Sequence, residues 1–442
     1  MFRPFTSRKI NKQDQPPQTE PQAIRVVITG VDQNETIPFK KVIAENLKAF
    51  DLFSVAFENE QETENFLNLD NKNFFDFLDS GLKILSTHQA DILIRIYHQK
   101  NNIRLNFQTA NIYERNDVPF FSLLNSLYLP LSCFKQEKLP QAISTLIAST
   151  LVALNIEKDK RFEALISHLV DILSKNKIPQ EIEAEFVPHI LNFLALNYLC
   201  ARPNGLEKQD VQSLLNLLDF AFKHVLKNDD VLLKGHLLTT LGQMYQASIG
   251  GKKADAYILL QRAIESYKRA QKHFNRYVFP YDYGRLSLVL AKLYFQFFKL
   301  SDDGQTLRDA VFHLREAEKI FTFAAFPEKW AQIQKDLGIY LLLLSSRSNN
   351  EEIAELAVQS FKNVETVFEK QKYPEKFADM QIQIGNLYYY LGKNISNKEY
   401  LEKSADYYTE AFDVFAKLQK KDRLTEIESY LEKVDQEIMR LI

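Results

Sequence analysis

Apolar residues in the second half of the chain follow a pattern that recurs every 47 residues. Three copies begin with an aromatic residue and a proline, and the prolines stand at positions 280, 327 and 374. Later in each copy an apolar residue is followed by a small one, as in Leu337-Gly338 and Ile384-Gly385. Proline is tolerated in the first helical turn, where its missing N–H would have no helical partner. The pattern therefore predicts one helix per copy, called helix A, that begins near the proline.

The second half of each copy carries four apolar or small residues separated by steps of 4, 3 and 4. These steps place the four side chains on one stripe of a helix, so we expect a second helix, B, in each copy. The stripe residues are Ala310, Leu314, Ala317 and Phe321, then Ala357, Phe361, Val364 and Phe368, then Ser404, Tyr408, Ala411 and Phe415.

Two weaker copies precede these three, and one helix follows them. The nearer copy has Leu241-Gly242 in helix A, and the fainter one has Leu194-Ala195. Their second helices carry Ala263, Tyr267, Ala270 and Phe274, and Leu214, Leu218, Ala221 and Val225. A last helix A begins at Lys421 in place of proline, and no second helix follows it, as expected for a polar cap. We predict a repeat region over 184–442 with a capping helix from 421.

Glycines at positions 242, 338 and 385 lie in the middle of predicted first helices. Glycine in a helix costs about 1 kcal/mol relative to alanine, so these positions need a compensating reason. A close approach of helix B, whose facing stripe also offers Ala or Ser, would supply one. The length of the copy leaves roughly 19 residues for each helix once short turns are subtracted.

Leu-Gly in helix A, with an aromatic residue or Leu three positions later, and Ala, aromatic, Ala in helix B together resemble the tetratricopeptide repeat (TPR). The resemblance covers 184–442 and implies a mainly α, right-handed α-α superhelix of 47-residue helix pairs. The copies are longer than the family's usual repeat of about 34 residues. Gln334 and Gln381 also stand where the family often has Trp. HEAT-like repeats are the structural alternative.

The amino-terminal part has a different pattern of apolar and polar residues. "AIRVVITGV" and "FSVAF" predict strands, while "PFKKVIAENLKAF" and "NKNFFDFLDSGLKILSTHQ" predict helices. "DILIRIYHQKNNIRLNFQT" predicts a hairpin, because apolar and polar residues alternate around Asn101-Asn102. We expect a small α/β domain over 23–135 with helices on one face of its sheet, and connecting helices over 136–183.

The order of these elements resembles the small α/β domain of FlgO and of the amino-terminal part of TolB in bacteria. Those relatives are exported envelope proteins, whereas this chain begins with "MFRPFTSRK", which lacks the apolar segment of a signal peptide. Residues 1–22 are polar and rich in proline, and we expect a disordered tail there. Phe2 and Arg3 in that tail leave contact with an anionic membrane as an open alternative.

Composition restricts the functional classes. The chain has 55 Lys and Arg against 57 Asp and Glu, so it lacks the positive field that attracts nucleic acid. Two cysteines cannot form a disulfide framework or a four-cysteine zinc site. No apolar run reaches the roughly 18 residues of a membrane span. These features predict a cytoplasmic protein that does not bind nucleic acid.

Motifs that carry chemistry are absent from the sequence. "TGVDQNET", after the first predicted strand, has one glycine and no Gly-Lys-Ser/Thr ending, so it is not a phosphate loop. The eight histidines never stand at metal-ligand spacing, and no nucleophile signature occurs. We therefore expect no enzymatic activity, no cofactor and no metal. The alternative is a regulated enzyme or a nucleotide or ligand sensor with its site in the α/β domain.

The remaining candidate site is the surface of the repeats. The TPR resemblance implies a concave side lined by helix A, at positions 5, 8, 12 and 15 after each proline. Amide, charged and apolar side chains there suit a peptide or a helix of another protein, so we predict a non-enzymatic scaffold or adaptor. The predicted partner-binding residues are His236, Gln243, Arg285, Lys292, Phe295, Gln332, Lys335, Asp379, Asn386 and Tyr389.

Overall fold

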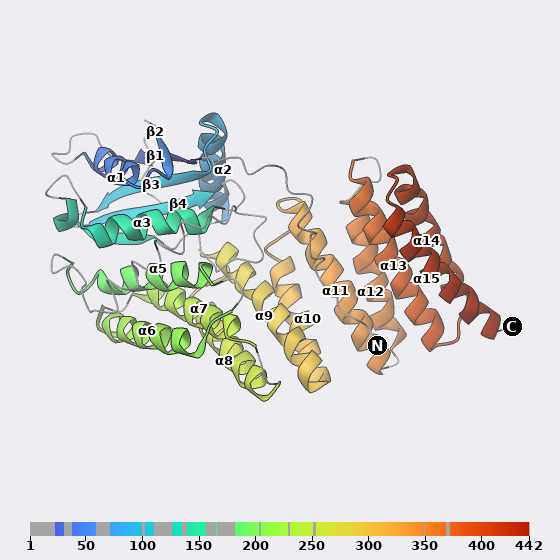
Figure 1. The fold of residues 1–442 in the computed structure, drawn as a ribbon. Coiled ribbons are helices and arrows are strands. Elements are labelled where there is room, and N and C mark those ends of the chain that lie inside the picture. Colours follow the sequence, from blue (N-terminus) through green and yellow to red (C-terminus); the bar gives the residue numbers. More distant parts are fainter. Residues whose placement is uncertain are drawn as a thin grey trace. The chain divides into compact units, whose positions relative to one another are not determined.

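The computed structural model describes residues 23–30, 38–58, 71–99, 102–109, 126–134, 139–155, 165, 182–202, 205–228, 230–250, 253–348, 350–367 and 372–441. They belong to two compact units (Figure 1), of which the first contains a sheet and the second only helices. The predicted tail, most of the segment "TGVDQNET" (29–36) and most of 156–181 lie outside the described residues.

The sheet of the first unit has five described strands in the order β2-β1-β3-β4-β5. Their bounds are β1 Ile24–Gly30, β2 Phe53–Phe57, β3 Ile92–Gln99, β4 Asn102–Thr109 and β5 Leu127–Pro130. Strands β2, β1 and β3 are parallel, and β4 is antiparallel to both of its neighbours. The predicted hairpin is confirmed, since Gln99 pairs with Asn102. Strand β5 was not predicted, because it is short and bears no alternating pattern.

Helices cover both faces of this sheet, so the prediction of helices on one face is wrong. They are α1 Phe39–Lys48, α2 Asn71–Thr87, α3 Gln141–Leu154 and α5 Val187–Cys200. Ile84 and Leu85 of α2 pack with Val27 and Leu93. Phe39 of α1 instead lies 5.7 Å from His98, ring to ring. Residues 93 and 98 of one strand point to opposite faces, which places α1 and α2 on opposite sides.

Helix α5 belongs to the first unit. It packs against α3 and β5, and Asn197 Nδ2 of α5 lies 2.8 Å from Ser149 Oγ of α3. Asn197 is fully buried, so this bond gives a polar side chain its partner inside the core. The two units meet in the sequence at Ala201 and Arg202, whereas the repeat pattern predicts a boundary at 184.

The second unit repeats its helices in register. Helices of the A type are α7 Val231–Ala247, α9 Pro280–Ser301, α11 Pro327–Ser348, α13 Pro374–Asn394 and α15 Lys421–Arg440. Helices of the B type are α6 Lys208–Asn228, α8 Lys253–Gln271, α10 Gly304–Glu318, α12 Glu351–Glu365 and α14 Lys398–Lys417. Helices α9, α11, α13 and α15 begin 47 residues apart, and so do α10, α12 and α14. The predicted fold class, a small α/β domain followed by a helical repeat region, is confirmed.

The helix B stripe forms the core of each pair. Ala310, Leu314, Ala317 and Phe321 are at most 1% exposed, and the same positions in the neighbouring copies are equally buried. Phe368 lies outside the described residues. Clusters such as that of Tyr408, Phe415 and Ile427 join α14 to the capping helix. Each pair thus covers the apolar face of the next, as stacked repeats require.

The glycines in helix A accommodate an aromatic ring of helix B. A Cβ at Gly338 would lie 2.5 Å from Cε2 of Phe361, and one at Gly385 would lie 2.6 Å from Cε1 of Tyr408. The predicted close approach of helix B is therefore confirmed at both glycines, although an aromatic ring makes the contact. At Gly385 the expected serine also faces the glycine, because Ser404 Oγ donates to the Gly385 carbonyl at 2.8 Å. In the copy that begins at Pro280, the same two positions hold Ala291 and Leu314. A larger residue in helix A thus coincides with a smaller one in helix B.

Each B helix after residue 300 has a polar N-cap at the same place in the copy. Asn350 Oδ1 accepts a hydrogen bond of 3.1 Å from the N–H of Ile353, and Asn397 Oδ1 accepts one of 3.3 Å from Tyr400. Asp303, at the equivalent position, accepts one of 2.9 Å from the N–H of Gln305. These bonds satisfy backbone donors that the first helical turn leaves without partners.

Gln334, which departs from the TPR pattern, links three helices. It is fully buried in α11. Its side-chain nitrogen donates to Glu318 of α10, and its oxygen accepts a bond of 3.0 Å from Asn363 of α12. A buried amide with both ends satisfied fixes the register of successive pairs.

Candidate functional site

Eight of the ten predicted partner-binding residues lie on three successive A helices, and we call the surface they form the A-face. Its residues are Arg285, Lys292 and Phe295 of α9, Gln332 and Lys335 of α11, and Asp379, Asn386 and Tyr389 of α13.

The other two predicted residues, His236 and Gln243 of α7, are largely buried. Only 5% of His236 and 8% of Gln243 is exposed. The His236 ring lies 5.1 Å from that of Phe274, so it takes part in packing between α7 and the end of α8. Neither side chain offers a ligand much surface. The spacing from proline could not indicate this, because α7 lacks the proline from which the positions are counted.

Aromatic contact joins α9 to α11 on the A-face. The ring of Phe295 stacks on that of Tyr340 with centroids 4.2 Å apart. Lys299 Nζ lies 5.0 Å from the centroid of the Phe295 ring. Phe295 is half-buried, so one part of its ring stabilises the contact between helices while another part remains on the surface. An aromatic residue in this position can contact an apolar side chain of a ligand.

Charged groups alternate across the next part of the A-face. Gln332 Nε2 donates to Asp336 Oδ1 at 3.1 Å. Burial raises the pKa of the Asp336 carboxyl, while the nearby charges of Lys292 and Lys335 lower it. The Asp336 carboxyl thus interacts electrostatically with one lysine of α9 and one of its own helix. Sequence reasoning missed Asp336, because it does not occupy one of the four positions assigned to the concave side.

Toward the capping helix, the A-face residues already have partners within the chain. Asp379 forms an ion pair with Arg423 of α15. Asn386 Oδ1 accepts a hydrogen bond of 2.8 Å from the Tyr408 hydroxyl of α14. Burial raises the pKa of Asp379 although Arg423 lowers it. This end of the A-face is thus electrostatically balanced.

The end near the start of α9 and α11 differs, because two cations lie beside one aromatic ring. Arg285 Cζ is 5.8 Å and Lys329 Nζ is 5.7 Å from the centroid of the Tyr281 ring. Lys329 Nζ also lies 5.0 Å from the Phe321 ring. Burial, and then repulsion from Arg285 and Lys292, lower the pKa of Lys329 to about 7. The prediction from sequence missed Lys329. A comparison of the copies could have drawn attention to it, because Lys329 and Lys376 are both cations two residues after the proline of their copy.

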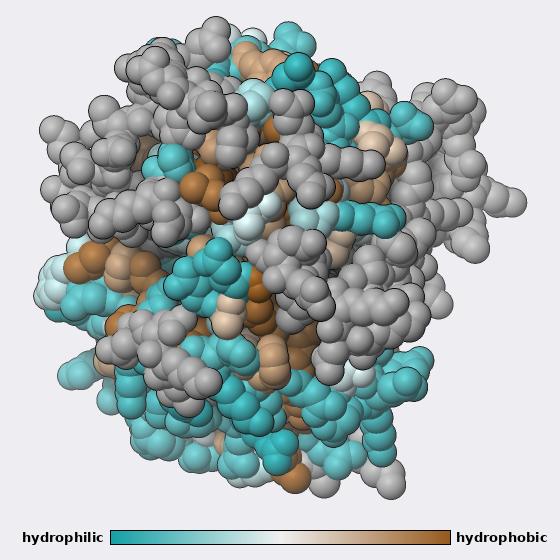
Figure 2. Space-filling model, turned by 90° about the vertical axis from the view of Figure 1, so that its left-hand side faces the viewer, coloured by the Kyte–Doolittle hydropathy of each residue, from teal (hydrophilic) through white to brown (hydrophobic). Residues whose placement is uncertain are grey.

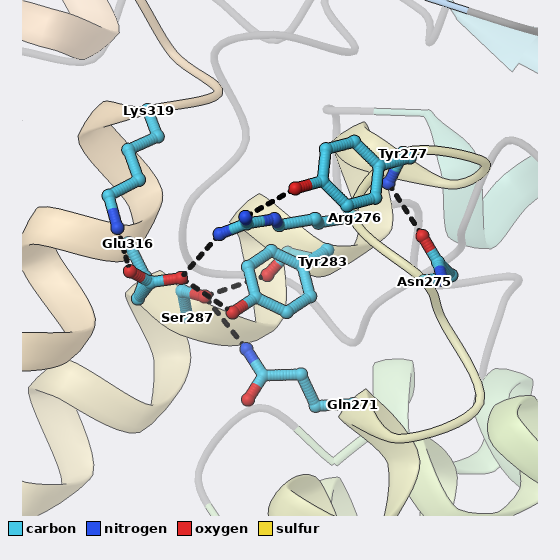
Figure 3. A network of polar contacts seen from close by, with 8 residues as sticks. All are labelled: Gln271, Asn275, Arg276, Tyr277, Tyr283, Ser287, Glu316 and Lys319. Carbon is cyan, nitrogen blue, oxygen red and sulfur yellow. Dashed lines mark hydrogen bonds and ion pairs between the residues drawn. The ribbon is translucent and has the colours of Figure 1, made fainter.

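A polar network fixes the turn between α8 and α9 (Figure 3). The Tyr283 hydroxyl donates to Glu316 Oε2 at 2.8 Å, and Lys319 and Arg276 form ion pairs with the same carboxylate. Burial raises the pKa of Glu316, but hydrogen bonds from Lys319 and Tyr283 outweigh it and the pKa is lowered. A carboxylate held ionised by three neighbours serves as a structural anchor and is a poor general acid.

Two buried arginines lie on the α2 face of the sheet in the first unit. Arg95 Nη1 donates to Gln108 Oε1 at 2.5 Å, and Arg104 Nε donates to Ser126 Oγ at 2.9 Å. Burial lowers the pKa of Arg104. Each guanidinium also lies over an aromatic ring. Arg95 Cζ is 4.0 Å from the centroid of the Phe77 ring, and Arg104 Cζ is 5.5 Å from that of Tyr97. These contacts stabilise the sheet face beneath α2.

Among the described residues, no group of three His, Cys, Asp and Glu side chains is placed to hold a metal ion. No helix among them combines the length and hydrophobicity that crossing a bilayer needs. On the face drawn in Figure 2, hydrophobic residues show in several separate places among hydrophilic ones. The A-face is the candidate site that the repeat pattern predicts.

No family model and no curated protein matches the sequence. Among solved structures, the chain is similar to a protein described as a "Circular tandem repeat protein with novel repeat topology and enhanced subunit contact surfaces". The alignment covers 68% of this chain and 85% of that one, with 15% identity and a TM-score of 0.26.

Proposed function

We propose that the chain is a non-enzymatic, cytoplasmic adaptor of bacterial type, whose TPR-like repeats bind a peptide or helix of another protein on the A-face. The observation that carries this proposal is the continuity of the A-face. Phe295 contacts Tyr340 of the next A helix, Lys292 lies near Asp336, and the charge of Lys335 on α11 lowers the pKa of Asp379 on α13. These contacts connect three successive A helices into one surface to which an extended segment of a partner can bind.

The composition of the A-face suits a peptide better than a nucleic acid. It carries cations, the carboxylates of Asp336 and Asp379, amides and a half-buried aromatic ring. A phosphate backbone running along it would meet both carboxylates, which repel it. A peptide can match alternating charges with side chains of either sign, and its apolar side chains can contact Phe295.

Reversing two charges on the A-face tests this function. Arg285→Glu combined with Lys292→Glu is expected to reduce cross-linked capture of the partner by about tenfold or more, because both cations become repulsive to the groups they attracted. Capture is measured with the full chain as bait in a lysate of the source organism, followed by mass spectrometry.

The matched control lies on helix B. Arg308→Glu with Arg315→Glu changes the same charge at the same spacing of seven residues on α10, and should leave capture unchanged. Circular dichroism checks that both double variants keep their helical content. Equal loss of capture in the two variants would mean that overall charge, and not the A-face, attracts the partner.

A further inference from the structure

The ammonium group of Lys329 is unusual among the A-helix lysines of this chain. It is half-buried against the faces of Tyr281 and Phe321, at 5.7 Å and 5.0 Å from their centroids. Among the described residues, none of the carboxylates forms an ion pair with it. Aromatic faces attract a cation but supply no counter-charge, so the positive charge of Lys329 stays unneutralised.

The next copy of the repeat shows how the chain neutralises a lysine in this position. Lys376 stands 47 residues after Lys329, and its Nζ lies 3.6 Å from Glu328 Oε2. Glu328 in turn occupies the position that Tyr281 holds one copy earlier. Between α11 and α13, the lysine in this position therefore contacts a glutamate. Between α9 and α11, the equivalent lysine contacts a tyrosine. Tyr281 therefore stands at the place where a carboxylate would pair with Lys329.

None of the described charged groups near Lys329 forms an ion pair with it. Arg285 flanks the Tyr281 ring from α9, and Lys292 follows two turns later on the same helix. On α11, Glu328 is engaged with Lys376, and Asp336 lies toward Lys292 and Lys335. Asp282, beside Tyr281, is fully buried. Lys329 also stands in the first turn of α11, where the helix dipole favours anions.

We propose that Lys329 and Arg285 bind a carboxylate of the peptide that occupies the A-face. Both cations lie near the same Tyr281 ring, at 5.8 Å and 5.7 Å from its centroid, and repulsion from Arg285 helps to lower the pKa of Lys329. A carboxylate that contacts both cations would relieve this repulsion. This inference rests on the proposed peptide-binding function and specifies one chemical feature of the ligand, which is a carboxylate from an acidic side chain or from the chain end.

Three peptides distinguish these sources, each labelled with a neutral boron-dipyrromethene dye that has no carboxylate of its own. They are hexaglutamate with an amidated end, hexaglutamine with a free carboxyl end, and hexaglutamine with an amidated end. Fluorescence anisotropy with the full chain is expected to show binding of at least one of the first two and not of the third. Binding should be strongest below pH 7 and weaken as pH rises, because Lys329 loses its proton in that direction.

Lys329→Met keeps the apolar stem, removes the charge, and is expected to weaken binding of the carboxylate peptide at least about tenfold. Lys376→Met is the matched control, one copy later, and should change binding less than twofold. If Lys329→Met fails to fold, Arg285→Gln provides the same test at the surface and is expected to weaken binding in the same direction.

The inference is overturned if no carboxylate peptide binds the unaltered chain, or if Lys329→Met and Lys376→Met have equal effects. A thymidine hexanucleotide that displaces the peptide from the A-face would also overturn it, since phosphate would then be the preferred anion. Partner capture that survives in Lys329→Met but is lost in the Arg285 and Lys292 double variant would refute this inference alone. Absence of any capture by the unaltered chain would refute the proposed function.

Discussion

Gly338→Ala is expected to lower the free energy of unfolding of the second unit by about 1–3 kcal/mol, the usual cost of overpacking a core. Alanine stabilises a helix by about 1 kcal/mol relative to glycine. The substitution would therefore be stabilising if the neighbouring helix left space for the added methyl group. Here the new Cβ would meet the Phe361 ring at 2.5 Å. A fully buried ring cannot move away without displacing its own neighbours.

The chain itself suggests the compensating change. Ala291 and Leu314 occupy the positions of Gly338 and Phe361 one copy earlier, so Gly338→Ala with Phe361→Leu should recover most of the lost stability. Urea unfolding followed by the fluorescence of Trp330, the single tryptophan, reports on α11 directly. Additive effects of the two substitutions would show that the residues do not determine each other's size.

Phe321→Ala is expected to cost about 3–5 kcal/mol, as is usual when a buried aromatic side chain is truncated. Phe321 is fully buried and packs edge-on against Tyr281 of α9 at 5.6 Å and Phe326, just before α11, at 5.2 Å. Its removal should therefore loosen the joint between two successive pairs and shift the urea midpoint read from Trp330. Phe312→Ala, on α10 with 58% of the residue exposed, is the matched control and should have little effect. A similar shift in both variants would contradict the stacked arrangement.

The repeat region could be predicted from sequence because its packing is local and periodic. Pro280, Pro327 and Pro374 begin their helices as predicted, and Lys421 begins the capping helix. The stripe on helix B fixes which side is buried. The close approach of helix B to Gly338 and Gly385 was predicted, but the aromatic rings that contact them were not. A one-dimensional pattern gives the face of a helix but not the point along it at which two helices touch.

The first unit and the candidate site were harder to predict from the sequence, because they depend on contacts between distant residues. Strand β5 and the placement of α5 depend on contacts between residues far apart in the chain, such as that of Phe107 with Phe193. Lys329 was missed because its environment is made by Tyr281 and Phe321 of neighbouring elements. Which charges lack a partner is a property of the packed helices, and the order of residues alone does not state it.

Lysine acetylation with and without the captured partner tests the A-face most directly. Mass spectrometry of the labelled full chain gives the reaction rate of each lysine. The account predicts that the partner slows the reaction of Lys292 and Lys335 and leaves Lys362 and Lys403, on helices α12 and α14, unchanged. Protection of Lys362 and Lys403 with continued reaction of Lys292 and Lys335 would contradict the account, because the partner would then occupy the B helices.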